Sequence, residues 1–194
     1  MEEKIEWKNG IIGFAVGDAL GTPIEFMDRS RFIDNPVTEM LGNMSHKMPK
    51  GSWSDDTSMT LATVDAIIQD KDIKYSTIAD NFVKWLKNAE YTPTERTFGV
   101  GSTCLHSISR YYHHKEAKAE KCGGSGEMDN GNGSLMRMVP LIYFKKASFF
   151  RNIGYKVIKN VSSITHAHPV SVLGCYIYVL FGKCLLDGWN LEQA

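Results

Sequence analysis

Residues Gly51–Gln69 read GSWSDDTSMTLATVDAIIQ. From Thr57 onward, apolar residues recur every three or four positions, at 61, 64, 67 and 68, which predicts a helix with one buried face. Directly before this run stand two adjacent carboxylates, Asp55 and Asp56, with hydroxyl side chains on both sides. Neighbouring acids repel one another, so the stretch raises the question of which positive charge compensates them.

Two answers suit the start of this helix. Ser54 or Asp55 can serve as the N-cap, and acids in a first turn interact favourably with the helix dipole. Two aspartates flanked by hydroxyls also offer several hard oxygen ligands within one turn, which suits Mg²⁺ or a similar ion. The two interpretations are compatible, because a helix start can be capped and still present its acids to a metal.

The rest of the chain also shows helical spacing, and no two-residue alternation is long enough to predict a sheet. We therefore expect an all-α fold in a single domain over residues 1–194. The expected helices are Ile11–Leu20, Thr57–Gln69, Ser76–Ala89, Ser102–Lys118, Ser134–Phe144 with a break at Pro140, Phe149–Ile164 and Pro169–Leu186.

The composition narrows the classes of partner. Lys plus Arg equals Asp plus Glu at 22 each, so no basic surface points to nucleic acid or to a membrane. The four cysteines form no C-x-x-C pair, which favours free thiols in a reducing cytoplasm, and the N-terminus has no signal-peptide core. The most apolar run, Val170–Gly182, is too short and mixed for a membrane span and predicts a buried helix.

The segment Gly17–Phe26, GDALGTPIEF, carries two acids around a turn. Asp18 is expected to cap or brace that turn. Glu25 lies between Ile24 and Phe26, and a carboxylate with apolar neighbours can have a raised pKa and act in acid–base chemistry. A glutamate on the surface of a turn is the plainer alternative.

Two later turns also bring polar groups together. Asn130–Arg137, NGNGSLMR, is a glycine-rich turn before a helix, which either cradles phosphate with backbone N–H groups or only redirects the chain. Arg137 would oppose the dipole there, which favours an acid or a ligand phosphate as its partner. In Thr165–Pro169, THAHP, the histidines are structural or bind a metal, although no third soft ligand is near.

Together GDALGTPIEF, GSWSDDTSM, GNGSLMR and THAHP, in this order and spacing, resemble the ADP-ribosylglycohydrolase family. The branch to which the chain is most similar is that of the bacterial ADP-ribosyl-dinitrogen reductase hydrolases. The resemblance implies a compact orthogonal bundle of many helices and a pair of Mg²⁺ or Mn²⁺ ions. It also implies hydrolysis of the glycosidic bond between ADP-ribose and a protein side chain or small conjugate.

Carried over residue by residue, the resemblance makes Ser54, Asp55 and Asp56 metal ligands, and makes Glu25 catalytic together with both aspartates. ADP-ribose is expected at the glycine-rich turn and at the first histidine of THAHP. The expected binding residues are Asn130, Gly131, Asn132, Gly133, Ser134 and His166. The acids and the binding residues should therefore meet in one cleft.

Two departures from the family pattern bear on activity. The family's second acidic metal segment, D-x-D-[S/T], has no counterpart, because Asp70-Lys71-Asp72 is followed by Ile73 and lies on the wrong side of the other motifs. Gly99, in TFGVGSTC, stands where close relatives commonly carry an aspartate, so the leaving group stays open.

We accordingly expect a chain that lacks the family's C-terminal third and binds metal weakly. Its function is then either that of the hydrolase or that of a non-catalytic relative that binds ADP-ribose. The face left by the missing helices is expected to form a homodimer or to bind a partner chain.

Overall fold

The structure is a computed structural model, and it describes residues 7–114, 117–144 and 153–194. Within these residues it has no strand, only an isolated bridge between Gly124 and His166, so the all-α prediction is confirmed. The α-helices are α1 (Trp7–Gly21), α2 (Asp55–Asp70), α3 (Tyr75–Asn88), α4 (Ser102–His113), α5 (Val139–Tyr143), α6 (Ile153–Ser162) and α7 (Pro169–Leu186). Short 3₁₀ turns are η1 (Thr22–Ile24), η2 (Arg29–Phe32), η3 (Ala119–Lys121), η4 (Glu127–Asp129) and η5 (Met136–Met138).

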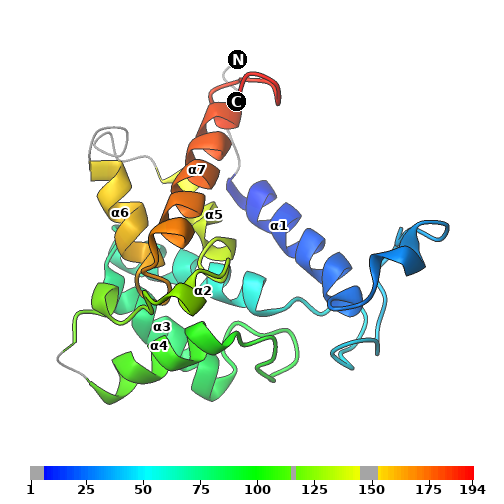
Figure 1. Cartoon of the computed structure of the whole chain (residues 1–194), viewed down its shortest axis with the longest axis horizontal. Coiled ribbons are helices and arrows are strands. Elements are labelled where there is room, and N and C mark those ends of the chain that lie inside the picture. Colours follow the sequence, from blue (N-terminus) through cyan, green and yellow to red (C-terminus); the bar gives the residue numbers. More distant parts are fainter. Residues whose placement is uncertain (1–6, 115–116, 145–152) are drawn as a thin grey trace.

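The helices α2 to α7 form one body, from which α1 leans away (Figure 1). α2 packs on α3, α3 packs on α4, and α7 packs on α5 and α6. α1 contacts α2 and α5, where Gly10 lies so close to Tyr143 that a side chain at that position would collide with it. The chain after α1 forms an arm beside the body before it returns into α2. The arm and the body thus meet at the start of α2.

The hydrophobic core lies between α2 and α3 and the helices that cover them. On α3, Ile78, Phe82 and Trp85 follow the spacing of one helix face, and all three side chains are fully buried. Truncating an aromatic side chain in such a core to alanine costs about 3–5 kcal/mol. This core therefore fixes the direction of α2, whose first turn carries the two aspartates.

Several helix boundaries differ from those expected. α2 begins at Asp55 and not at Thr57, and the helix expected over Ser102–Lys118 ends at His113. The segment Ser134–Phe144 is divided into η5 and α5, as the break at Pro140 predicted, because a proline is accommodated in a first turn but not in a helix interior. The expected helix Phe149–Ile164 lies partly outside the described residues, which show it from Ile153 to Ser162.

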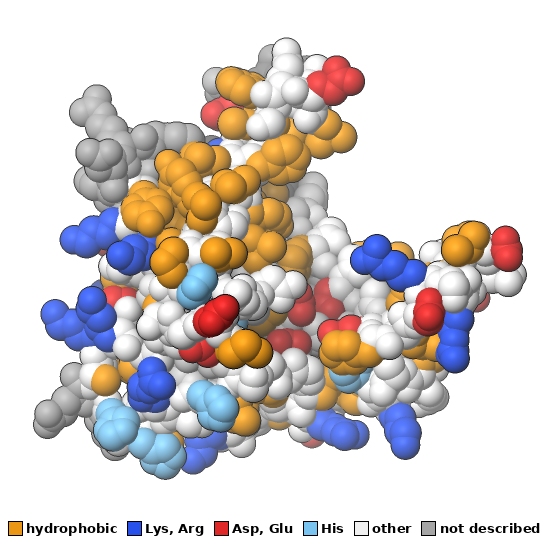
Figure 2. Space-filling model, viewed as in Figure 1, with side chains coloured by type: hydrophobic (Ala, Val, Ile, Leu, Met, Phe, Trp, Pro, Cys, Tyr) orange, Lys and Arg blue, Asp and Glu red, His pale blue; other side chains and the backbone are white. Residues whose placement is uncertain are grey.

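The expectation of a buried helix at Val170–Gly182 is wrong. α7 has the length and mean hydropathy (1.7) of a membrane-spanning helix, but only 28% of this window is buried, and one such helix is weak support for a membrane span. Figure 2 shows apolar side chains gathered over α7 and towards α1. The exposed apolar residues of α1 are Trp7, Ile12 and Val16, and those of α7 are Val170, Leu173, Ile177, Leu180 and Phe181. We call the five residues of α7 the α7 face.

Candidate functional site

The first turn of α2 is capped as the sequence predicted. Ser54 is the N-cap, and its Oγ accepts a hydrogen bond from the backbone N–H of Asp56 at 3.2 Å. Asp55 and Asp56 follow as the first two residues of the helix. Helix capping is therefore confirmed for this stretch, and it leaves the aspartate side chains free to face a neighbouring space.

A carboxylate from α1 completes this cap. Asp18 accepts hydrogen bonds from the backbone N–H groups of Ser54 and Thr57, both at 3.0 Å. It also accepts one from the hydroxyl of Thr22 at 2.8 Å, so its expected role in the local turn is present as well. The sequence did not indicate its contacts with α2, which lie 36 and 39 residues further along the chain.

The two aspartates have strongly perturbed pKa values. Burial, together with the charges of Asp56, Glu25 and Asp18, raises the pKa of Asp55 to about 8. Burial and the charges of Asp18 and Glu25 also raise the pKa of Asp56, although its hydrogen bond with Ser54 lowers it. Each carboxylate is therefore held near others of the same sign.

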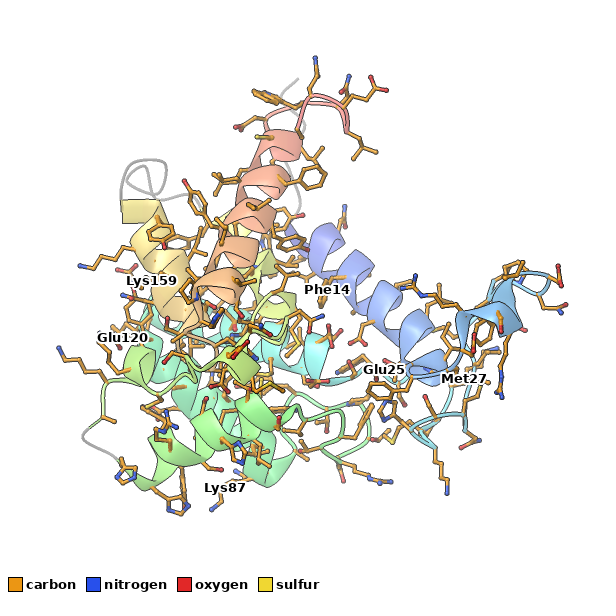
Figure 3. The ribbon with its side chains drawn as sticks, viewed as in Figure 1. Phe14, Glu25, Met27, Lys87, Glu120 and Lys159 are labelled. Atoms are coloured by element: carbon orange, nitrogen blue, oxygen red, sulfur yellow. The ribbon has the colours of Figure 1, made fainter. Side chains whose placement is uncertain are left out.

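Glu25 does not lie in the apolar surroundings that its neighbours in the sequence suggested. Its side chain is 43% exposed and contacts His46 Nε2 through Oε2 at 2.6 Å. The His46 ring lies between those of Phe26 and Phe98, with centroids 5.9 and 5.3 Å away. In Figure 3, Glu25 lies at the foot of α1, close to the chain that leads into α2, while Phe14 projects from α1. His46 therefore fixes the carboxylate that the sequence made catalytic.

The glycine-rich turn and His166 form the opposite side of the site. His166 Nδ1 contacts Thr165 Oγ1 at 2.8 Å, and its other nitrogen faces the turn, since a side chain at Gly131 would lie 3.7 Å from Nε2. Burial and the charge of Arg137 lower the pKa of His166 to about 4, against a smaller opposite effect of Asp129. The imidazole is therefore neutral at pH 7, with Nε2 directed towards the turn.

Arg137 forms no ion pair with an acid among the described residues, so the expectation of an acidic partner is wrong there. The side chain is fully buried and donates to the carbonyl oxygens of Gly133, Val161 and Ser162 at 3.0–3.2 Å. Its guanidinium also lies 4.9 Å from the centre of the Phe82 ring. The arginine thus ties the glycine-rich turn to the end of α6 instead of presenting a charge to a ligand.

A cleft of about 680 Å³ joins the two sides. The predicted residues that line it are Glu25, Asp55, Asp56, Gly131, Asn132, Gly133 and His166. Ser54 lines an adjoining hollow of about 420 Å³, which shares Glu25 and Asp56 with the cleft. Ser134 is buried beneath the turn, where it accepts a hydrogen bond from Ser162, and Asn130 is exposed outside the lining.

Other residues of the cleft were missed by the sequence analysis. Phe14 of α1, Cys104 of α4 and Tyr178 of α7 all line it. His46 stands within the aperiodic segment Asp28–Ser54, where no spacing links it to Glu25. A histidine in an otherwise irregular loop of that length was the only available signal.

The oxygen donors of the acids in the cleft are of the type that a hard cation prefers, but among the described residues they are too few to form a complete site. Ser54, Asp55 and Asp56 supply only oxygen atoms, which Mg²⁺ and Mn²⁺ prefer, and no Lys or Arg among the described residues forms an ion pair with either aspartate. However, the described part of the chain contains no group of three or more His, Cys, Asp or Glu side chains that could hold a metal ion. The described residues therefore offer suitable oxygen donors but no complete set of ligands.

Comparison with known proteins decides the family. The sequence profile of the family described as ADP-ribosylglycohydrolase matches residues 6–194. The chain belongs to the ADP-ribosylglycohydrolase family. Among its relatives, the ADP-ribosyl-[dinitrogen reductase] glycohydrolase of Rhodospirillum rubrum is 30% identical over 196 residues, covering 94% of this chain and 58% of the relative.

Other relatives agree with this assignment. The ADP-ribosylarginine hydrolase Tri1 of Serratia proteamaculans is 27% identical over 187 residues, covering 96% of this chain and 49% of the relative. A solved structure described as an ADP-ribosylglycohydrolase-related protein complex has the same fold, with a TM-score of 0.77 at 24% identity, over 96% of this chain and 58% of that one. This ADP-ribosylglycohydrolase chain thus spans about half the length of the curated relatives it matches.

Proposed function

We propose that this chain forms the part of an ADP-ribosylglycohydrolase site that binds ADP-ribose and hydrolyses its glycosidic bond to a protein side chain. The observation that supports this most directly is the meeting of Glu25, Asp55 and Asp56 with the Gly131–Gly133 turn and His166 in one cleft. Relatives named as hydrolases of ADP-ribosylarginine and of ADP-ribosyl-dinitrogen reductase support the substrate class.

The glycine-rich turn is the proposed site of the diphosphate. Backbone N–H groups in such turns bind anions, and Asn132 is exposed at the cleft, where its amide can donate to a phosphate oxygen. His166 is neutral, so its Nε2 can exchange a hydrogen bond with a ribose hydroxyl without adding charge to the sugar. This side of the cleft would hold the ligand without reacting with it.

The acids of the opposite side are the proposed catalytic groups. Glycosidic cleavage develops positive charge on the sugar, which nearby carboxylates stabilise. Glu25 would accept a proton from a water molecule as the oxygen of that water bonds to the anomeric carbon. The bond from this carbon to the protein side chain breaks, and the departing atom takes up a proton from solvent. The hydrogen bond of Glu25 to His46 would keep one carboxylate oxygen occupied and leave the other directed at the water.

Ser54, Asp55 and Asp56 are the proposed ligands of Mg²⁺ or Mn²⁺. Such an ion supplies charge that anchors ribose hydroxyls and acidifies or orients a bound water. The two aspartates would bind it in their ionised forms, which burial and the neighbouring carboxylates Asp18 and Glu25 disfavour in its absence. Affinity in this chain is expected to be weak, because one acidic segment offers few ligands.

The second candidate function is ADP-ribose binding without turnover. The lack of a complete metal-ligand group within the described residues favours it for this chain taken alone. Turnover of ADP-ribosyl-arginine, ADP-ribosyl-serine and small ADP-ribose conjugates with Mg²⁺ or Mn²⁺ separates the two. Hydrolysis that is lost in Glu25→Gln supports the enzyme, whereas calorimetric ADP-ribose binding with no turnover of any substrate supports the binding protein.

The α7 face is the proposed contact surface for a second copy of the chain or for a polypeptide that supplies the rest of the family domain. It is apolar and exposed, and the chain matches only 48–59% of its curated relatives' length. We further propose a cytoplasmic protein that needs neither nucleic acid nor a membrane, in keeping with its balanced charge and free thiols. Sedimentation of the protein with Leu173→Glu as a comparison tests the dimer.

A further inference from the structure

The carboxylate of Asp18 accepts five hydrogen bonds, and only the one from Thr22 comes from its own turn. Its donors are Thr22 Oγ1 (2.8 Å), Ser54 N (3.0 Å), Ser54 Oγ (2.8 Å), Thr57 N (3.0 Å) and Thr57 Oγ1 (2.7 Å). The bond from Thr22 lies within the α1–η1 segment, and the other four come from the start of α2. One side chain therefore joins two segments that are far apart in the sequence.

These contacts occupy both oxygens of the carboxylate. Oδ1 accepts from Thr22 and Ser54 hydroxyls, and Oδ2 accepts from two backbone N–H groups and the Thr57 hydroxyl. A carboxylate offers about four acceptor positions, so Asp18 has little capacity left for water or a cation. It thereby differs from Asp55 and Asp56, which line the cleft.

The joined segments are those that carry the acids of the cleft. Glu25 directly follows η1, whose first residue, Thr22, is held by Asp18. Asp55 and Asp56 stand between the two residues of α2 that Asp18 holds. Asp18, Glu25 and Asp56 also line the same hollow beside the cleft.

Asp18 also determines where the Ser54 hydroxyl directs its proton. The hydroxyl has one proton and lies 2.8 Å from Asp18 Oδ1 and 3.1 Å from Asp56 Oδ2. Donation to the nearer carboxylate leaves the lone pairs of Ser54 for the Asp56 N–H and for the cleft side. A hydroxyl whose proton is directed at Asp18 keeps a lone pair available, and a metal ligand needs such a lone pair.

We infer that Asp18 is a positioning residue that sets the distance between Glu25 and the Asp55–Asp56 pair, and the orientation of Ser54, without touching the substrate. This inference rests on the proposed function of the acids as metal-binding and catalytic groups. It predicts that loss of Asp18 damages the acid side of the cleft and leaves the ADP-ribose side unchanged.

The test compares Asp18→Asn with the matched control Asp28→Asn. Asp28 also caps a helix, since it accepts from Ser30 N at 2.8 Å, but it is exposed and caps η2 instead of α2. Asp18→Asn should weaken Mn²⁺ affinity and lower kcat by about tenfold or more, as loss of a residue that orients ligands typically does. Asp28→Asn should change neither, and KM and calorimetric ADP-ribose affinity should stay within about twofold in both variants.

Amide hydrogen exchange gives a readout that does not need turnover. The Ser54 and Thr57 amides should lose protection in Asp18→Asn and keep it in Asp28→Asn, even if the protein proves to bind ADP-ribose without hydrolysing it. If Asp18→Asn does not fold, Thr22→Val removes only the bond to the η1 side and should still lower Mn²⁺ affinity or kcat. Unchanged Mn²⁺ affinity and amide protection, or an equal loss of ADP-ribose affinity, would overturn the inference.

Discussion

The side of the cleft that carries Gly133 and His166 is anchored by buried, hydrogen-bonded side chains, whereas the side that carries the aspartates ends in the exposed Glu25. On the first side, Arg137 holds three carbonyl oxygens and His166 is only 3% exposed. On the second, Glu25 is 43% exposed and depends on a histidine from an irregular loop. We call them the turn side and the acid side.

The acid side depends on a bound cation or on protons for its stability, and the turn side does not. The turn side is held by hydrogen bonds within the protein, which fix its geometry on folding, although Nε of Arg137 is buried without a hydrogen-bond partner among the described residues. The acid side brings like charges together and needs a cation or protons to relieve their repulsion. Substitutions on the turn side should therefore change stability first, and substitutions on the acid side should change activity first.

The largest loss of stability is expected for Arg137→Met. The change leaves the carbonyl oxygens of Gly133, Val161 and Ser162 without their donor in a buried site, which should cost about 3–5 kcal/mol of unfolding free energy. Arg110→Met is the control, because Arg110 also donates to a carbonyl, that of Cys122, but is exposed. Urea unfolding measures both, and equal losses would contradict the distinction.

A pH-dependent loss of stability follows from His166. Its pKa is about 4 in the folded protein against 6.5 unfolded, so protons bind preferentially to the unfolded chain between these values. The contribution of His166 to stability is complete above pH 6.5, and its loss should lower the free energy of unfolding by on the order of 3 kcal/mol as the pH drops to 4. In His166→Gln this part of the pH dependence should vanish, while His168→Gln, at a half-buried position that caps α7, should keep it. An unchanged slope in His166→Gln would show that the histidine is not buried neutral.

A smaller effect is expected for Gly133→Ala. The new Cβ would lie 2.8 Å from His166 Cε1 and 3.3 Å from Cys104 Sγ, so the ring must move at a cost of about 1–3 kcal/mol. Gly131→Ala is the comparison, because its Cβ would have an ordinary contact of 3.7 Å. Thermal unfolding and ADP-ribose calorimetry should both separate the two alanines, with Gly133→Ala the weaker binder.

The sequence predicted the turn side and the acid side to different degrees. Helical spacing located α2, α3 and α7, because an amphipathic or apolar period survives in any tertiary context. The exposure of α7 was not predictable, since apolar composition alone does not say what covers a helix. Likewise, no local pattern revealed that Arg137 is enclosed by carbonyl groups, because these come from residues 24 and 25 positions away as well as from the adjacent turn.

The acid side depends on contacts that sequence spacing does not express. The motifs identified Glu25, Asp55 and Asp56, and the structure brings all three to one cleft. His46 was not predicted, because it reaches Glu25 across 21 residues of chain with little regular structure. Asp18 was assigned only its local contact for the same reason.

The smallest change in stability, with a clear change in activity, is expected for His46→Ala. The pair with Glu25 is partly exposed, and pairs of this kind contribute about 0–1 kcal/mol to stability. Loss of the histidine frees the Glu25 carboxylate to rotate, so kcat should fall while the affinity for ADP-ribose stays unchanged. Steady-state kinetics beside denaturation measures this, with His113→Ala as an exposed control on α4. A stability loss as large as that of Arg137→Met would remove the contrast between the two sides.

The residue at position 99 and the side chain of Asp55 are expected to depend on one another in evolution. Gly99 has φ +75°, and a Cβ there would collide with Oδ1 of Asp55. A larger residue at position 99 can therefore be accepted only if the Asp55 side chain turns away, so the two sites should be epistatic. A lineage that gains a side chain at position 99 should change the orientation of Asp55 in the same step, and one that keeps glycine retains the present arrangement. Reconstructed ancestors of this branch would reveal the order in which these two states arose.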